Sequence, residues 1–318
     1  MKDLFTLIFV FPVLCIAGLL TGCMGGGGGF TIWDGDLGDI DYNGSSSHPF
    51  IKWSDVTAPD AVDFDGLSSD GSYTAPAPGF SVTSITDNGF SIGSKATIVY
   101  DGGGSITSIA IQTPVTTVIW KESDGDLIDD SGAIIGVRNV VGSKAALVSN
   151  ALDPSVGWEY QTYGVWATGL GQGAGTYGAI SVGVPTAGSS IPLIGDATFT
   201  GSTVGGYVDP AGTYFLTSGS VSVDADFVNR SLDFSSASTQ TINPSSFATS
   251  PAPNLNMTGT LTYAPGTNSF GGGVTTVGGL TGTSTGQFYG PNAEELGGVF
   301  FLTGDGVEMY DGSYGAKR

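Results

Sequence analysis

The sequence is poor in the side chains on which most catalytic sites depend. It contains one histidine, His48, and two cysteines. A Ser-His-Asp hydrolase needs an oriented histidine base, whereas His48 lies in a Ser-Ser-Ser-His-Pro stretch that is typical of a turn. The sequence has no cluster of His, Cys or carboxylate residues with the spacing of a zinc site. It also has no P-loop, because none of its glycine runs leads into Lys-Ser or Lys-Thr. We therefore expect no enzyme activity, no catalytic residues and no metal site.

Basic residues are also scarce. The chain has nine Lys and Arg residues and 29 Asp and Glu residues, so its formal net charge is −20. Such a chain repels nucleic acid and anionic lipid head groups. We expect no nucleic-acid partner, and a protein partner that presents a basic face.

The longest apolar stretch lies at the N-terminus. Residues 4–20 follow Lys2 and lead into Leu-Thr-Gly-Cys. This is the layout of a secretory signal, and it is short for a membrane span. Leu-Thr-Gly-Cys resembles a lipobox, which implies cleavage between Gly22 and Cys23 and acyl chains such as palmitate on Cys23. The alternative is an ordinary cleaved signal followed by an accidental cysteine.

Cleavage at this point would remove Cys15 with the signal. Cys23 would then be the only cysteine of the mature chain, so an internal disulfide is excluded. A glycine run at residues 25–29 suits a flexible tether after the anchor. Met24 follows Cys23 in place of the Asp that commonly retains lipoproteins at the inner membrane, which favours the outer membrane.

The rest of the chain reads as all-β. Sustained helical periodicity is missing, and the best helix candidate, residues 144–152, is short. Alternation with a period of two is clear around residues 220–227, 231–234 and 257–263. Turn signals separate these stretches, which predicts a sandwich or a barrel.

A distinct stretch near the C-terminus, residues 286–300, predicts a strand, one helical turn and a second strand. Pro291 suits the first helical position, and Gly297 and Gly298 are placed to end the turn before a strand that starts at Val299. We expect its main role to be structural, with Phe288 and Tyr289 on opposite faces of one strand. The signature residues are Gly286, Phe288, Tyr289, Gly290, Pro291, Ala293, Glu294, Gly297 and Gly298.

The stretch resembles the barrel signature of the transferrin-binding protein B-like lipoproteins. Residues 195–201 resemble the first barrel strand of that family, and residues 226–232 its strand pair of Asp-Phe followed by a basic residue. Residues 157–166 resemble a segment that precedes the barrel in single-lobe members. The resemblance implies an all-β fold with a C-terminal eight-stranded antiparallel β-barrel preceded by a β-rich handle domain.

The expected organisation has four parts. They are a signal peptide at 1–22, a lipidated cysteine and flexible tether at 23–50, a β-rich handle at 51–191 and the barrel at 192–318. The handle and barrel loops are where members of the family recognise ligands.

Members of this family are surface lipoproteins that bind host proteins, including transferrin, haemoglobin and complement factor H, and some single-lobe relatives bind haem. This chain has one lobe where the transferrin receptors have two, and none of their transferrin-contacting loops is matched. The resemblance implies an outer-membrane, cell-surface lipoprotein that binds an unidentified host or environmental protein, or haem. A TonB-dependent receptor is a further expected partner. The alternative is a structural or adhesive surface module without a soluble ligand.

Two other features are candidates for ligand binding. His48 is a candidate axial haem ligand, although an exposed loop histidine is the interpretation we favour. Two Asp clusters are candidate calcium sites; the second has part of the required spacing but has Ile135 where an EF-hand loop has its distal Glu. We favour solvated turns for both. The clusters are Asp34, Asp36, Asp39 and Asp41, and Asp124, Asp126, Asp129 and Asp130.

Overall fold

The computed structural model describes residues 47–77, 81–244 and 248–318, which belong to one compact unit. In these residues the regular structure is β-strand, interrupted by single 3-10 turns. The all-β prediction is therefore confirmed. No helix among the described residues has the length and apolarity needed to cross a membrane. The 3-10 turns are η2 (Trp53–Asp55), η3 (Glu122–Asp124), η4 (Gly188–Ser190) and η5 (Pro253–Leu255).

The first sheet, which we call the handle, runs in the order β5-β4-β3-β2-β10-β9-β8-β7-β6. All of these neighbours are antiparallel, and the short β1 joins β2 in parallel. The edge strands β5 and β6 are consecutive in sequence and close in space, so the sheet is nearly closed. The strands are β1 (His48–Pro49), β2 (Asp60–Thr74), β3 (Ser84–Tyr100), β4 (Ile106–Gln112), β5 (Thr117–Lys121), β6 (Leu127–Asp129), β7 (Ile134–Arg138), β8 (Lys144–Ser149), β9 (Gln161–Thr168) and β10 (Ala174–Gly183).

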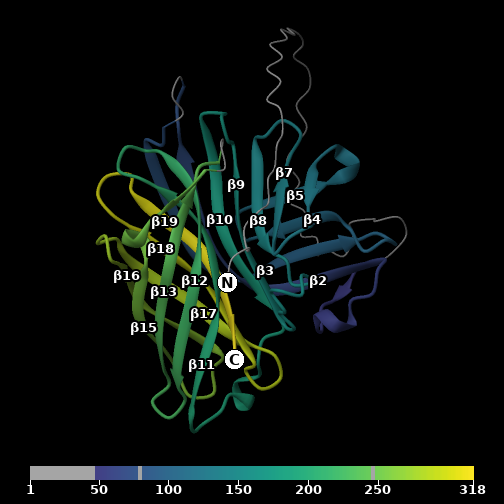
Figure 1. The fold of residues 1–318 in the computed structure, drawn as a ribbon, viewed down its shortest axis with the longest axis vertical. Coiled ribbons are helices and arrows are strands. Elements are labelled where there is room, and N and C mark those ends of the chain that lie inside the picture. The colour runs from purple at the N-terminus through teal and green to yellow at the C-terminus, as the bar shows by residue number, and fades with distance from the viewer. Residues whose placement is uncertain (1–46, 78–80, 245–247) are drawn as a thin grey trace. The chain divides into compact units, whose positions relative to one another are not determined.

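The second sheet closes into an eight-stranded antiparallel barrel. Its order is β12-β11-β19-β18-β17-β16-β15-β13, and pairing of β12 with β13 completes the circle. The short β14 is an extra strand on β13. Figure 1 colours the handle purple to teal and the barrel green to yellow. The strands are β11 (Asp196–Val208), β12 (Tyr214–Asp226), β13 (Ser231–Ile242), β14 (Thr249–Pro251), β15 (Met257–Tyr263), β16 (Ser269–Thr276), β17 (Thr281–Tyr289), β18 (Glu295–Thr303) and β19 (Met309–Lys317).

The alternating patterns place one face of each barrel strand in the core, as predicted. Val221 and Val223 of β12 are buried, as are Leu232 and Phe234 of β13, while the residues between them are more exposed. Together with aromatic side chains such as Phe288, they form a packed cluster inside the barrel. Side chains fill an eight-stranded barrel in this way because its interior is only about as wide as they need.

Two expectations about local structure were wrong. Residues 144–149 of the candidate helix at 144–152 form the strand β8, because Ala146 and Val148 alternate into the handle core while the strand pairs with β7 and β9. The predicted tether extends to residue 50, but β1 already pairs with β2 at His48, and Phe50 is buried against Phe64. The handle sheet thus begins before the predicted boundary. The change from one sheet to the next falls between Gly183 and Asp196, and the expected boundary between residues 191 and 192 lies within this interval.

Candidate functional site

The two aromatic residues of the signature point to opposite sides of the barrel wall. Phe288 lies in the barrel core, with its ring centroid 5.3 Å from that of Phe270. Tyr289 points outward to the handle, where its hydroxyl is 2.9 Å from Ser181 Oγ, and burial raises its pKa to about 12. A Cβ on Gly286 would overlap the Phe270 ring. This part of the signature therefore serves packing on both sides of β17.

The two signature glycines Gly297 and Gly298 lie inside β18 and serve close packing. A Cβ on Gly298 would stand 2.7 Å from the Tyr314 hydroxyl inside the barrel. A Cβ on Gly297 would stand 2.7 Å from Ser181 Oγ in the handle and would overlap Gln161. Real Cβ atoms do not approach other atoms this closely, so the two positions exclude any larger residue without rearrangement.

The prediction of a helical turn between the two strands was wrong. The chain reverses in a non-helical turn in which Gly290 and Ala293 have positive φ values of 86° and 59°. The strand β18 then begins at Glu295, which pairs with Tyr289, and not at Val299. Pro291 is exposed in this turn. The reason is that pairing with β17 and β19 extends β18 back to residue 295, so Gly297 and Gly298 are needed for close approach and not to end a helix.

The side chain of Glu294 holds the reversed chain in shape. Its carboxylate accepts hydrogen bonds from the Asn292 backbone N–H and side-chain amide, both at 2.8 Å. Burial is the largest single influence on the pKa of Glu294 and raises it. The hydrogen bonds act in the opposite direction, and the pKa is lowered from its ordinary value. The Gly290 N–H donates to the Val184 carbonyl, and Thr186 Oγ1 donates to the Gly290 carbonyl at 2.6 Å. The turn is thus tied to the segment that links handle and barrel.

Glu295 binds the handle segment that precedes β9. Its buried carboxylate accepts the backbone N–H groups of Glu159 at 2.7 Å and Tyr160 at 3.1 Å. Burial raises the pKa of Glu295 to about 7, while these two donors and Lys317 act in the opposite direction. Lys317 itself donates to the carbonyl groups of residues 156 and 157. The family-like segment 157–166 is therefore one part of the handle that docks on the barrel.

Gln161 continues this contact one residue further along. Its side-chain N–H₂ donates to the carbonyl groups of Leu296 at 2.9 Å and Ala316 at 3.2 Å. Its own backbone carbonyl accepts the indole N–H of Trp53 at 2.8 Å. Because β18 and β19 direct alternate residues inward and outward, Val299 packs into the handle core. The sheets are joined by hydrogen bonds and shared apolar packing.

A second buried carboxylate lies on the outward face of β19. Asp311 Oδ1 accepts a 2.5 Å hydrogen bond from Ser69 Oγ of β2. Burial raises the pKa of Asp311 to about 7, and the nearby charges of Asp87 and Asp70 act in the same direction, although Ser69 opposes them. Two carboxylates with raised pKa values thus lie in the contact between handle and barrel.

A small apolar cavity of about 80 Å³ lies where this contact reaches the surface. It is formed between the ends of β2, β9 and β10 and the ends of β11, β12 and β19. Tyr73 and Tyr177 line it from the handle, and Tyr214 from the barrel; burial raises the pKa of all three hydroxyls. The other lining residues are Ala75, Val82, Ala167, Leu170, Gly171, Val208 and Met309.

Exposed aliphatic residues lie in a turn beside this cavity. Leu170 lines the cavity, and its N–H donates to the Ser143 carbonyl at 3.0 Å, which joins the β9–β10 turn to the β7–β8 turn. In the latter turn, Val140 and Val141 are 71% and 74% exposed. We call the cavity together with Leu170, Val140 and Val141 the apolar face. Such a patch at turns is typical of a recognition surface.

Carboxylates border the barrel side of the apolar face. Asp209 lies in the β11–β12 turn, and Asp305 and Glu308 lie in the β18–β19 turn. Glu308 Oε1 accepts the Tyr207 hydroxyl at 2.7 Å, so that this carboxylate is fixed in place. An apolar centre bordered by carboxylates suits a partner with an apolar side chain flanked by basic residues.

His48 is occupied by neighbours in the handle. Its Nε2 is 2.8 Å from Asp60 Oδ1, and its Nδ1 is 3.2 Å from the Pro49 carbonyl. The Pro49 carbonyl is the largest influence raising the pKa of His48, and Asp60 acts in the same direction. The side chain is exposed but lies on a strand and not in a free loop. Both ring nitrogens therefore have partners other than a haem iron.

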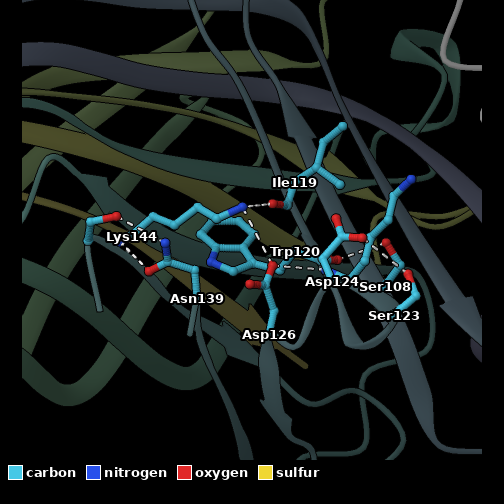
Figure 2. A network of polar contacts seen from close by, with 10 residues as sticks. Ser108, Ile119, Trp120, Ser123, Asp124, Asp126, Asn139 and Lys144 are labelled. Carbon is cyan, nitrogen blue, oxygen red and sulfur yellow. Dashed lines mark hydrogen bonds and ion pairs between the residues drawn. The ribbon is translucent and has the colours of Figure 1, made fainter. Parts of the chain in front are cut away.

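Part of the second Asp cluster is structural, so the cluster is not simply a solvated turn. Asp126 is buried; its carboxylate accepts the Lys121 N–H at 3.1 Å and lies 3.5 Å from Lys144 Nζ. Figure 2 shows Lys144 reaching from β8 to both Asp126 and the Ile119 carbonyl, with its ammonium over the Trp120 ring. These contacts join β8, and the segment that leads into β6, to the edge strand β5.

Two further carboxylates of this cluster also have partners in the chain. Asp130 Oδ2 accepts the Ile106 N–H of β4 at 2.9 Å, and Asp129 Oδ1 accepts from Ser131. Within the described ranges, no three His, Cys, Asp or Glu side chains gather as metal ligands. The first Asp cluster, residues 34–41, lies outside the described residues, as do Gly22 and Cys23.

Sequence reasoning missed the residues that dock the handle on the barrel, above all Gln161, Glu295 and Asp311. One signal was present: residues 296–302 are an unbroken run of apolar and small residues, which is typical of a strand buried on both faces. A carboxylate at the start of such a strand has to be satisfied by hydrogen bonds. The handle segment that it contacts, residues 157–166, has no comparable pattern.

The barrel matches a known family. Residues 191–318 match the model described as the C-lobe and N-lobe beta barrels of Tf-binding protein B. The match confirms, over the barrel, the family that the signature resembles. No curated protein matches the chain.

Similar solved structures come from proteins with related names. Transferrin-binding protein B of Haemophilus parasuis is 18% identical, with 70% of this chain and 50% of that chain covered and a TM-score of 0.43. The protein of the same name from Neisseria meningitidis is 16% identical, with 79% and 43% covered and a TM-score of 0.43. The N-lobe of lactoferrin-binding protein B of Moraxella bovis is 13% identical, with 80% and 99% covered and a TM-score of 0.37. The chain spans about half the length of the first of these proteins. These likenesses are distant, so the assignment of the barrel to a family rests on the family match alone.

Proposed function

We propose that this chain, whose C-terminal barrel belongs to the transferrin-binding protein B barrel family, is a lipid-anchored outer-membrane protein that binds a protein ligand at the cell surface. The family match and the Leu-Thr-Gly-Cys23 motif support the anchor and the location. The relatives are named for binding transferrin or lactoferrin. For this chain we propose a role in iron or haem acquisition, with a TonB-dependent receptor as the membrane partner.

The observation that carries the proposal is the apolar face. It combines a cavity between handle and barrel with exposed Val140, Val141 and the neighbouring Leu170, and it is bordered by carboxylates. An aliphatic or aromatic side chain of the ligand would enter the cavity, and basic residues around it would meet Asp209, Asp305 and Glu308. Burial of apolar area at the centre would give affinity, and the carboxylates would give orientation. Binding, and not catalysis, is the activity that such a surface supports.

The test is direct binding of the mature chain without its lipid to immobilised transferrin, lactoferrin and haemoglobin. The double variant V141D/L170D places two carboxylates in the apolar face and is expected to weaken binding at least tenfold. The matched control is V228D, the same kind of change at an exposed valine of the β12–β13 turn, at the other end of β12 from Tyr214. Equal binding by all three forms would contradict the site. Failure of the unchanged chain to bind any of the three ligands would favour a structural or adhesive surface module.

A further inference from the structure

Three exposed aliphatic residues lie at the barrel end opposite the cavity. Leu193 and Ile194, just before β11, are 81% and 80% exposed, and Val228, just after β12, is 56% exposed. The Gly195 carbonyl accepts the Phe227 N–H at 3.1 Å, which extends the β11–β12 ladder by one pair. Ile194 and Val228 adjoin this pair along the two chain segments. We call these three residues the apolar tip.

The apolar tip and the cavity lie at opposite ends of the same strands. The strand β11 runs from Asp196, beside the tip, to Val208, which lines the cavity. Its thirteen residues span roughly 40 Å at about 3.3 Å per residue. A surface that contacts the tip therefore leaves the apolar face free.

The described chain also enters at the end of the barrel that carries the tip. The Trp53 N–H donates to the Glu159 carbonyl at 2.9 Å, and Glu159 is bound by Glu295 at the start of β18. Glu295 pairs with Lys317, which in turn pairs with Thr200 near the start of β11. A membrane anchor that precedes Ser47 in the chain thus joins the domain on this side. Residues 24–46 separate Cys23 from Ser47, and a chain of that length spans at most about 80 Å.

We propose that the apolar tip rests in the interface of the bilayer that holds the lipid of Cys23, so that the apolar face points away from the membrane. The proposal rests on the lipid anchor of the proposed function. The tether is long enough for several faces of the domain to reach the bilayer. The surface chemistry of the domain therefore determines which face contacts it. Aliphatic side chains without charge gain free energy by entering the acyl boundary.

The size of the tip favours a bilayer over a protein. Three aliphatic side chains bury far less than the roughly 1,000 Å² that a specific protein interface needs. A bilayer needs no shape complementarity, and the lipid of Cys23 keeps it within reach. The exposed carboxylate of Asp196 and the net charge of −20 oppose contact with anionic lipids, so we expect the contact to be stronger on zwitterionic vesicles.

The chain offers a clean experiment because acylated Cys23 would leave no free thiol. The full chain is expressed in a bacterium that processes lipoproteins, as the single variants I194C and V277C, and each new cysteine is labelled with an environment-sensitive fluorophore. Val277 is the matched control: it is 75% exposed, and its β16–β17 turn lies at the cavity end, since Thr281 pairs with Thr303 and Thr303 with Met309. The proteins are reconstituted in phosphatidylcholine vesicles with or without nitroxide-labelled lipid.

The expected result is a blue-shifted emission at position 194 that the nitroxide lipid quenches several-fold more than emission at position 277. Equal quenching at the two positions, or stronger quenching at 277, would overturn the orientation. A blue shift at 194 that depends on protein concentration and resists the nitroxide lipid would show that a second copy covers the tip, which also overturns it. Protein that fails to float with the vesicles at all would refute the lipid anchor, and this outcome is distinct from the other two.

Discussion

Gly297 of the barrel lies directly against Gln161 of the handle, with no room for a side chain between them. The close approach lets the Gln161 amide donate to the Leu296 carbonyl at 2.9 Å. The signature glycine is therefore required by the neighbouring sheet and not by the turn that precedes it.

Replacement of Gly297 by alanine is expected to lower the free energy of unfolding by about 1–3 kcal/mol, the usual cost of forcing an extra methyl group into a packed interior. Urea denaturation followed by tryptophan fluorescence measures the change. Gly273→Ala is the control, because a Cβ at that position would have only one neighbour, 3.9 Å away. If G297A were as stable as G273A, the close packing between the sheets would be contradicted.

The barrel core could be predicted from sequence, whereas the contact between the sheets could not. Val221, Val223 and Phe234 alternate with polar residues because one face of each strand is wet, and this pattern is readable. Every residue of β18 except the last is buried, so its sequence does not say which face meets the handle. Register between segments distant in sequence, such as Glu159 with Glu295, leaves no local pattern at all.

Deprotonation of Asp311 is expected to make the fold less stable as the pH rises. Burial, with the charges of Asp87 and Asp70, raises the pKa of Asp311 from 3.8 to about 7. Between pH 4 and 7 the folded chain therefore binds more protons than the unfolded chain, so this group loses stability as the pH rises through that range. Glu295, with its pKa raised to about 7, acts in the same direction.

The variant D311N isolates the contribution of this group, since asparagine keeps an acceptor for Ser69 Oγ and does not ionise. Between pH 5 and pH 8, we expect the urea midpoint of D311N to fall less than that of the unchanged chain. Over this range the free energy of unfolding of D311N should increase relative to that of the unchanged chain by on the order of 1 kcal/mol or more. Urea denaturation at a series of pH values measures it. Parallel pH profiles for the two proteins would show that Asp311 is ionised throughout.

Loss of Lys144 is expected to destabilise the handle. The variant K144M leaves the buried Asp126 carboxylate without its cation, which costs about 1–3 kcal/mol. The control K52M removes the exposed pair of Lys52 with Asp55 and should cost less than about 0.5 kcal/mol. Thermal unfolding compares the two. Equal losses would contradict a structural role for the buried pair.

The same assay tests calcium at the second Asp cluster. Because Asp126 and Asp130 are engaged by backbone N–H groups and Lys144, millimolar calcium is expected to leave the unfolding temperature unchanged. A ligand that binds only the folded state would raise it. A rise with calcium that magnesium does not reproduce would restore the calcium hypothesis.

His48 is expected to play no part in haem binding. An axial ligand needs a free ring nitrogen, whereas Nε2 of His48 faces Asp60 and Nδ1 faces the Pro49 carbonyl. Titration of the unlipidated mature chain with haemin should therefore give the same Soret spectra for the unchanged chain and for H48A. The variant D60N serves as the control, because it weakens the hold on the imidazole without removing it. A Soret shift that H48A abolishes and D60N enhances would mean that haem competes successfully with Asp60, and the haem ligand hypothesis would then stand.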